Sequence, residues 1–132
     1  MGKFEHIENL GKELCEKETL SQSILDAIDN TTEGIALLDN NQLYTYMNRT
    51  HEVLLGYNRK ELLGKSWKVL YKESEVIRLE KIIAEELPKG GRWEGSAIAI
   101  CKDGITELEQ YICLTDLGEG SLVCNCRENK KK

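Results

Sequence analysis

The spacing of apolar residues changes several times along the chain, and each change predicts a different secondary structure. Over residues 3–28, apolar side chains recur three and four positions apart among Glu and Lys, which predicts an amphipathic helix with one narrow apolar seam. Two short apolar runs follow at residues 35–38 and 43–47. The polar turn 39–42 between them is typical of a β-hairpin.

Helical patterns fill the middle of the chain. Asn48 precedes a short helical pattern that ends before Gly56, and an Asn side chain at that point is suited to cap the first turn. A second short helix is predicted for residues 59–63. The longest helical pattern covers residues 73–87 and has a broad apolar face, and Pro88 with the glycines after it predicts the end of that helix.

Three strand-like segments complete the chain, at residues 93–101, 105–115 and 121–127. The first turn between them contains Asp103 and Gly104, a pair typical of hairpins. One strand pair and one strand triplet, separated by helices, indicate an α+β domain with a single antiparallel sheet of five strands. The long helix is expected to pack across one face of that sheet.

Length and charge limit the classes of function. The 132 residues suffice for one domain, and the net charge of −5 argues against a general nucleic-acid binder, which would need a basic face. No apolar run is long enough to cross a bilayer and no signal peptide is evident, so we expect a cytoplasmic chain without membrane contact. No catalytic triad, phosphate loop or spaced set of metal ligands is present, so we expect neither catalysis nor a metal site.

The five cysteines have no spacing typical of a zinc site or a disulfide scaffold. Reduced cysteines that pack as small hydrophobic side chains are the simplest interpretation. The alternative is thiol redox sensing by Cys113, Cys124 and Cys126, which would require accessible thiols of low pKa.

Residues 33–67 have the sequence EGIALLDNNQLYTYMNRTHEVLLGYNRKELLGKSW. They combine Asp39 at the end of the first strand, Asn48 before the next helix and Gly56-Tyr57 after it. In this combination they resemble the N-terminal core of PAS domains. The later stretches WEG (93–95) and KDG (102–104) are similar to further markers of the family, and the resemblance covers about residues 22–128.

The resemblance implies a PAS-like α+β fold, with a five-stranded antiparallel sheet in the order 2-1-5-4-3 and helices on one face. It divides the chain into an N-terminal amphipathic helix or linker (1–28), a PAS domain (29–128) and a polar tail (129–132). PAS modules usually sense or relay signals within larger regulators such as histidine kinases. We therefore expect a sensory or signal-relay module with a downstream effector domain, which binds a small ligand non-covalently or none.

The family's usual cofactors do not fit the residues. Photoreceptor relatives place a reactive Cys in the region after the second strand, and residues 48–57 contain none. Haem relatives use an axial His on or near the long helix, and residues 73–87 contain none. Non-covalent flavin is an alternative, since Asn48, Trp67 and Trp93 could line its pocket, but the last strands lack a set of amide donors. We expect no cofactor.

The register implied by the family, counted from Gly104, assigns the pocket. In that register Glu109 faces the helix-covered side, where it would hold a small polar or cationic ligand or reach water at the rim. A slip of one residue would reverse every assignment on the strand. The expected pocket residues are Asn48, Tyr57, Trp67, Ile82, Trp93, Ala99, Glu109, Tyr111, Cys113, Cys124 and Cys126.

The same register leaves apolar side chains on the outer face of the sheet, a patch too large to stay wet. Its natural cover is the N-terminal seam of the same chain or of a second copy, so we expect a homodimer. The residues expected in this contact are Leu10, Leu14, Ile98, Ile100, Ile112, Leu114 and Val123. A ligand-free dimerisation module is the alternative to a sensor, and an interior cavity of roughly 300 Å³ or more would favour sensing.

Overall fold

The computed structural model describes residues 22–129, which fall into two units, Met1–Asn30 and Thr31–Lys132. In the first unit, residues 22–29 are helical, at the end of the predicted N-terminal helix. The remainder of that predicted helix, including Leu10 and Leu14, lies outside the described residues. Among the described residues, none of the helices combines the length and the apolar character that crossing a bilayer requires.

The second unit contains one five-stranded sheet in which every pairing is antiparallel. The strands are β1 (Gly34–Leu38), β2 (Tyr44–Met47), β3 (Arg92–Ile100), β4 (Glu107–Gly118) and β5 (Ser121–Glu128). Their order is β2-β1-β5-β4-β3, so the last strand in the chain lies at the centre of the sheet. The predicted fold class and strand order are confirmed.

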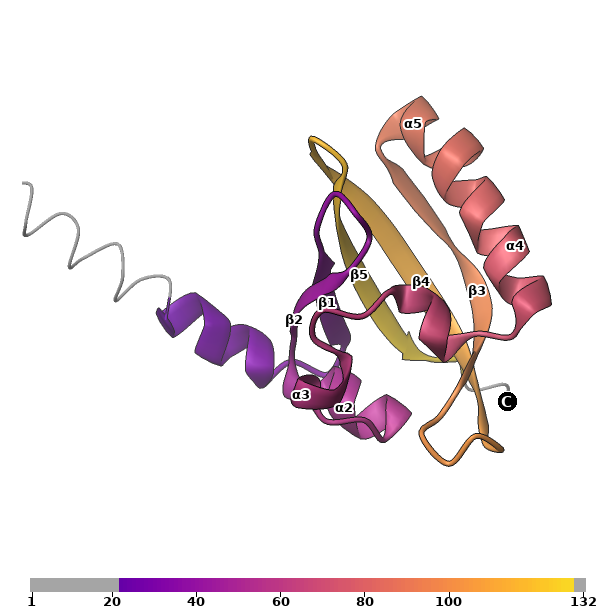
Figure 1. The fold of residues 1–132 in the computed structure, drawn as a ribbon. Helices are drawn as coiled ribbons and strands as arrows, with labels where there is room; N and C mark the ends of the chain where they lie inside the picture. The colour runs from indigo at the N-terminus through magenta and orange to yellow at the C-terminus, as the bar shows by residue number, and fades with distance from the viewer. Residues whose placement is uncertain (1–21, 130–132) are drawn as a thin grey trace, which may run out of the picture. The chain divides into compact units, whose positions relative to one another are not determined.

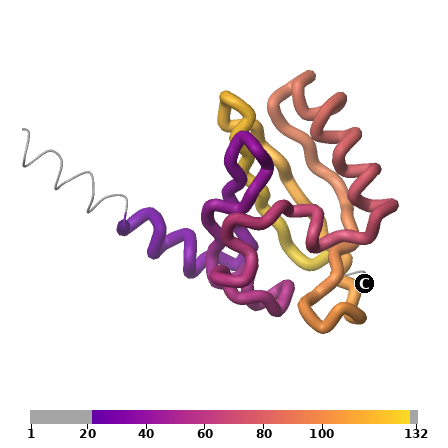
Figure 2. Tube along the Cα trace, viewed as in Figure 1, coloured from indigo at the N-terminus to yellow at the C-terminus, as the bar shows by residue number. Residues whose placement is uncertain are grey.

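Helical segments connect the edge strand β2 to the opposite edge strand β3. They are α2 (Arg49–Leu55), α3 (Arg59–Leu62), η1 (Trp67–Leu70), α4 (Glu73–Lys81), η2 (Ile82–Glu86) and α5 (Leu87–Gly90). The run from α4 to α5 lies alongside β3 and β4, whereas α2 and α3 lie near the end of β1 and β2 (Figures 1 and 2). The core therefore lies between this helical layer and one face of the sheet.

The long helix differs from its prediction because of Pro88. Proline has no N–H for the carbonyl four residues back, and its ring crowds that carbonyl. The helix widens into the π-helix η2 just before it, where the N–H of Leu87 bonds to the carbonyl of Ile82. The helix then continues as α5, with Pro88 in its first turn, and is capped by Gly91, whose φ is 74°. The predicted end at Pro88 is therefore about one turn early.

Asn48 joins the sheet to α2. Its side-chain oxygen accepts hydrogen bonds from the N–H of His51 at 3.0 Å and from the N–H of Ile35 at 2.8 Å. Its amide donates to the carbonyl of Glu33 at 2.9 Å. The predicted helix cap is confirmed, and the same side chain also fixes the start of β1.

The observed register of β4 differs by one residue from the predicted register. Leu108, Gln110, Ile112 and Leu114 are buried on the helix-covered face, and Glu109, Tyr111 and Cys113 point to the opposite face. Gln110 pairs with Ala97, and Leu108 with Ala99, which fixes the face because both alanines belong to the core. The one-residue slip that sequence reasoning left open is the actual arrangement.

The predicted outer patch changes with the register. Ile98, Ile100 and Val123 lie on the outer face, by alternation with buried neighbours. Ile112 and Leu114 belong to the core instead, so their prediction as outer contacts is wrong. Because exposing leucine and isoleucine side chains to water costs more free energy than exposing polar ones, the apolar side of the strand faces the helices.

Gly34 allows α2 to lie close to β1. A Cβ at this position would lie 2.9 Å from the Cys126 sulfur and 3.1 Å from the Cα of His51. The second contact is with backbone, which cannot rotate away. The approach of the helix to the strand therefore requires glycine.

Gly34→Ala is expected to lower the free energy of unfolding by about 1–3 kcal/mol, because the added methyl overpacks this contact. Urea unfolding followed by circular dichroism measures the change. The matched control is Gly90→Ala, since a Cβ there meets no atom within 4 Å and alanine favours the helix. Equal stability of the two variants would contradict the packing argument.

Candidate functional site

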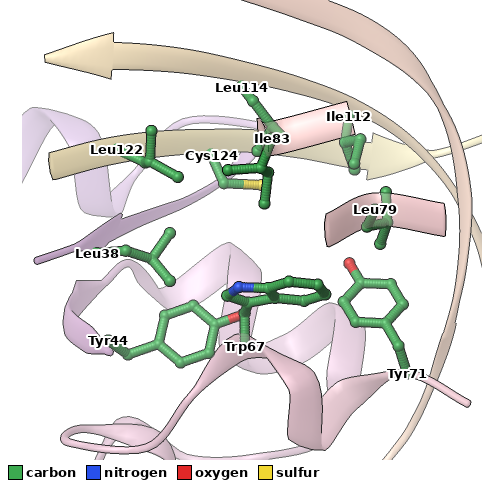
Figure 3. Close-up of a pocket in the computed structure, with 10 residues that line it drawn as sticks. All are labelled: Leu38, Tyr44, Trp67, Tyr71, Leu79, Ile83, Ile112, Leu114, Leu122 and Cys124. Carbon is green, nitrogen blue, oxygen red and sulfur yellow. The ribbon is translucent and has the colours of Figure 1, made fainter. Parts of the chain in front are cut away.

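The interior of the second unit contains a small cavity between the sheet and the helical layer (Figure 3). Its volume is about 30 Å³, which is room for one water molecule. The wall is mostly apolar and draws side chains from β1, β2, η1, α4, η2, β4 and β5. The lining residues are Leu38, Tyr44, Trp67, Tyr71, Leu79, Ile83, Ile112, Leu114, Leu122 and Cys124.

A buried polar pair crosses from the helical layer to the sheet beside this cavity. The Tyr71 hydroxyl donates a hydrogen bond of 2.7 Å to the side-chain oxygen of Gln110, which is 2% exposed. Burial raises the pKa of Tyr71 well above its ordinary value, so the hydroxyl keeps its proton and remains a donor. The Gln110 amide also hydrogen-bonds the sulfur of Cys126. The pair therefore ties η1 and its neighbouring loop to β4 and β5.

Trp67 forms a second tie across the cavity wall. Its indole N–H donates to the side-chain oxygen of Gln42 at 2.7 Å, and its ring meets the Tyr71 ring edge-on with centroids 5.8 Å apart. Gln42 has a φ of 62°, a left-handed conformation that is uncommon for a residue with a side chain. The indole thus links the cavity wall to the turn between β1 and β2.

Tyr44 contributes the remaining hydroxyl of the wall. The residue is 5% exposed, and burial raises the pKa of its hydroxyl well above the ordinary value. Figure 3 shows that hydroxyl beside Trp67. Like Tyr71, it therefore stays protonated and offers a neutral donor and acceptor in an apolar setting.

Burial raises the pKa of the two thiols near the interior, Cys124 and Cys126. The Cys124 sulfur faces the cavity, and burial raises the pKa of this thiol well above its ordinary value (Figure 3). Burial also raises the pKa of Cys126 to about 12. Because the thiolate is the reactive form, these directions oppose redox sensing by the two residues. Cys113 lies on the other face of the sheet and does not join them.

The predicted pocket residues separate into four groups. Trp67 and Cys124 line the cavity. The hydrogen bonds of Asn48 are made to backbone near β1, away from the cavity. Those that belong to the surrounding core are Tyr57, Ile82, Trp93, Ala99 and Cys126. Those that lie on the outer face, contrary to prediction, are Glu109, Tyr111 and Cys113.

Gln110, Tyr71 and Tyr44 are polar residues of the interior that the predicted pocket did not include. Gln110 was placed on the outer face by the register error, and Tyr71 follows η1 in a loop without a periodic pattern. The alternation of Leu108, Ile112 and Leu114 with Glu109, Tyr111 and Cys113 indicates only that Gln110 shares the apolar side of the strand. Nothing local in the sequence indicates the contact between two residues 39 positions apart.

His51 is a buried titratable group near the start of β1. It is 3% exposed, its Nδ1 has no hydrogen-bond partner, and its ring meets Tyr44 edge-on at 5.8 Å. Burial lowers its pKa to about 4, although the neighbouring Glu52 carboxylate acts in the opposite direction. The described residues contain no group of three or more His, Cys, Asp or Glu side chains that could hold a metal ion.

The family model of the PAS fold matches residues 22–127. The chain is similar to the signal transduction histidine-protein kinase AtoS of Escherichia coli, with 33% identity over 69 residues, which are 52% of this chain and 11% of the kinase. The chain thus spans about a tenth of the length of this curated relative.

Two solved structures share the fold. A PAS domain from Colwellia psychrerythraea has a TM-score of 0.77 and 19% identity, over 86% of this chain and 99% of that one. The PAS domain of a LuxR-family transcriptional regulator from Burkholderia thailandensis, in complex with ethanol, has a TM-score of 0.71 and 18% identity, over 78% of this chain and 94% of that one.

Tyr71→Phe is expected to lower the free energy of unfolding by about 1–3 kcal/mol, because it leaves the buried Gln110 oxygen without its donor. Thermal and urea unfolding measure the loss. Tyr57→Phe serves as the matched control, with an expected change within about 0.5 kcal/mol. Adding Gln110→Met to Tyr71→Phe should recover part of the loss, and strict additivity of the two changes would argue against the pair.

His51 predicts a pH dependence of stability. Its folded pKa of about 4 lies below its ordinary value of 6.5, so the unfolded chain binds the proton more tightly. Its contribution is therefore full above pH 6.5 and falls as the pH drops to about 4, by about 3 kcal/mol in total.

Unfolding free energies at a series of pH values measure this slope, and His51→Phe should flatten it between pH 6.5 and 4.5. His6→Gln, which changes the chain's other histidine, is the comparison and should leave the slope in place. A slope that survives in His51→Phe would assign it to other groups.

Proposed function

The chain belongs to the PAS family, and on that premise we propose that it is the signal-relay module of a larger signal-transduction protein, a histidine kinase or a related regulator. PAS domains of such proteins are sensory modules, and the kinase activity lies in other domains. The proposal therefore assigns no catalysis to this chain. The effector domain belongs to the parent protein, whose relative AtoS is about nine times as long as the matched portion.

The interior volume is the observation that carries this proposal. A cavity of about 30 Å³ is far below the several hundred Å³ of a typical ligand pocket. Signal relay then works through packing: a change in the position of α4 or η1 moves β4 through the bond between Tyr71 and Gln110. Gln110 faces the interior and the next residue, Tyr111, faces the opposite side, so one strand serves both faces of the sheet.

A small neutral ligand is the second candidate, and the polar groups of the cavity favour it. Tyr44 and the pair of Tyr71 and Gln110 offer hydroxyl and amide groups against apolar walls. A molecule with one hydroxyl and a few carbon atoms would match this arrangement after a modest outward movement of α4. The similar Burkholderia domain holds ethanol, which is of this size.

We propose no resident cofactor. The segment from Asn48 to Tyr57 has no cysteine for a flavin adduct, and α4 and η2 have no histidine for a haem iron. The buried thiols of Cys124 and Cys126 keep their protons. Reduced thiols also suit a cytoplasmic location, which we include in the proposal.

The outer face of the sheet supports a homodimer in this proposal. Partly exposed apolar residues form a continuous row across three strands there, since Tyr46 pairs with Leu37 and Leu37 with Val123. Ile35 extends the row along β1. We propose that this row packs against a second copy and against the N-terminal seam with Leu10 and Leu14.

Native mass spectrometry with an absorption spectrum of the purified chain tests these points together. The expected result is a dimer without a chromophore and without a bound molecule larger than a short alcohol. A stoichiometric chromophore, or a bound molecule of drug or lipid size, would overturn the proposal of a nearly filled interior.

Leu37→Glu should shift the dimer to monomer, because a charge at the centre of the apolar row must be desolvated on association. Ile105→Glu is the matched control, since Ile105 is 84% exposed in the loop between β3 and β4. Dissociation by both variants alike, or by neither, would contradict the proposed contact. A thermal shift by ethanol that is lost in Tyr71→Phe would favour the second candidate.

A further inference from the structure

A polar cleft lies on the outer face of the sheet, opposite the interior cavity. Its volume is about 310 Å³, about ten times that of the interior and within the range of small-molecule sites. Its walls come from β3, β4, β5 and the residue before β1. The proposed function does not use this cleft.

The strand register places the charged groups of the cleft. Tyr111 on β4 pairs with Arg127 on β5. Gly34 pairs with Cys126, so Glu33, which lines the cleft, lies at the level of Arg127 on the adjacent strand. Adjacent strands are about 4.8 Å apart. A carboxylate and a guanidinium therefore border the same part of the cleft.

One side of the cleft is already neutralised. The Glu94 carboxylate forms an ion pair with Arg92 and accepts a hydrogen bond of 2.9 Å from the Tyr111 hydroxyl. These two donors hold the pKa of Glu94 below its usual range. Glu94 thus fixes the Tyr111 ring and has no oxygen left without a donor.

Arg127 is positioned by the Tyr111 ring. Its guanidinium lies over that ring, 5.0 Å from the centroid, and its charge helps to lower the pKa of Glu94, but none of the ion pairs among the described residues includes it. Stacking on a ring uses the face of the guanidinium and leaves its N–H groups available at the edge. That edge matches a carboxylate, which it binds through two parallel hydrogen bonds.

Glu33 provides the complementary charge. One of its carboxylate oxygens accepts a hydrogen bond of 3.3 Å from the Asn125 amide, which orients the group. The second carboxylate oxygen of Glu33 and the side-chain carbonyl oxygen of Asn125 are acceptors that suit an ammonium group. A simple anion would be repelled by Glu33 and a simple cation by Arg127, so the cleft discriminates against both.

We propose that this cleft binds a small zwitterion of the α-amino acid class. The ligand carboxylate binds the N–H edge of Arg127, and the ligand ammonium binds Glu33 and the Asn125 carbonyl. The ligand side chain extends towards Arg92 and Cys113, which line the rest of the cleft. Tyr111 and Glu94 position Arg127 and do not touch the ligand.

Isothermal titration and NMR titration of the full 132-residue chain test this proposal. The probes are the common L-amino acids, first in pools, with acetate and ethylamine as partners that carry one charge each. Saturable binding of at least one amino acid is expected, with acetate and ethylamine at least tenfold weaker. Absence of saturable binding by every amino acid, or equal binding of acetate, would overturn the proposal.

Arg127→Gln and Glu33→Gln remove one charge each and should each weaken binding of the amino acid at least tenfold. Lys89→Gln is the matched control, because Lys89 pairs with Glu86 on an exposed helix turn outside the cleft, and it should leave binding unchanged. Circular dichroism confirms that each variant folds. Unchanged affinity in Arg127→Gln would show that the cleft is not a ligand site. The same conclusion would follow if either variant changed the oligomeric state and left the affinity for the amino acid unchanged.

Discussion

The alternation of side chains along β4 is the constraint on which the rest of the structure depends. It directs Leu108, Ile112 and Leu114 into the core and leaves Tyr111 and Cys113 on the other face. Burial of the apolar set supplies the free energy that fixes this choice, because a slip of one residue would exchange the two sets. Gln110 is carried into the interior by the same choice, and its cost of desolvation is offset by the hydrogen bond from Tyr71.

The two faces of β4 border different environments, an apolar interior and a charged outer surface. On the inner side, bulky side chains reduce the cavity to the volume of one water, and its few polar groups are neutral because burial keeps the tyrosines and thiols protonated. On the outer side, charged groups stay in contact with water and form polar contacts along and across strands, since Glu94 pairs with Arg92 on the same strand and accepts a hydrogen bond from Tyr111 on the next strand. Neutral groups inside and charges outside are the expected consequence of the different cost of desolvation on the two faces.

Glycines that allow close contact between neighbouring elements also determine the structure of the second unit. Gly34 lets the backbone of α2 reach β1, and Gly95 leaves room for the Trp93 ring, which a Cβ at 95 would meet at 2.4 Å. Asn48 completes the junction of helix and strand through three hydrogen bonds with backbone. Asn48 and Trp93-Glu94-Gly95, which carried the family resemblance, therefore help to position the elements, whereas Gln110 and Tyr71, which form the buried polar pair, lie outside those motifs.

The sequence by itself determined the strands, the helices except η1 and the last turn of the long helix, the helix cap at Asn48 and, through the resemblance, the sheet order, because periodicity and turn residues act over a few neighbouring positions. It also determined that Trp67 and Cys124 lie near the interior. Only the tertiary structure decided which face of β4 is buried, and with it the places of Gln110, Glu109 and Tyr111. The apolar alternation marks one side of that strand, but the pairing of Gln110 with Ala97 on β3 decides which side meets the helices. That pairing joins residues on separate strands, and no local pattern in the sequence records it.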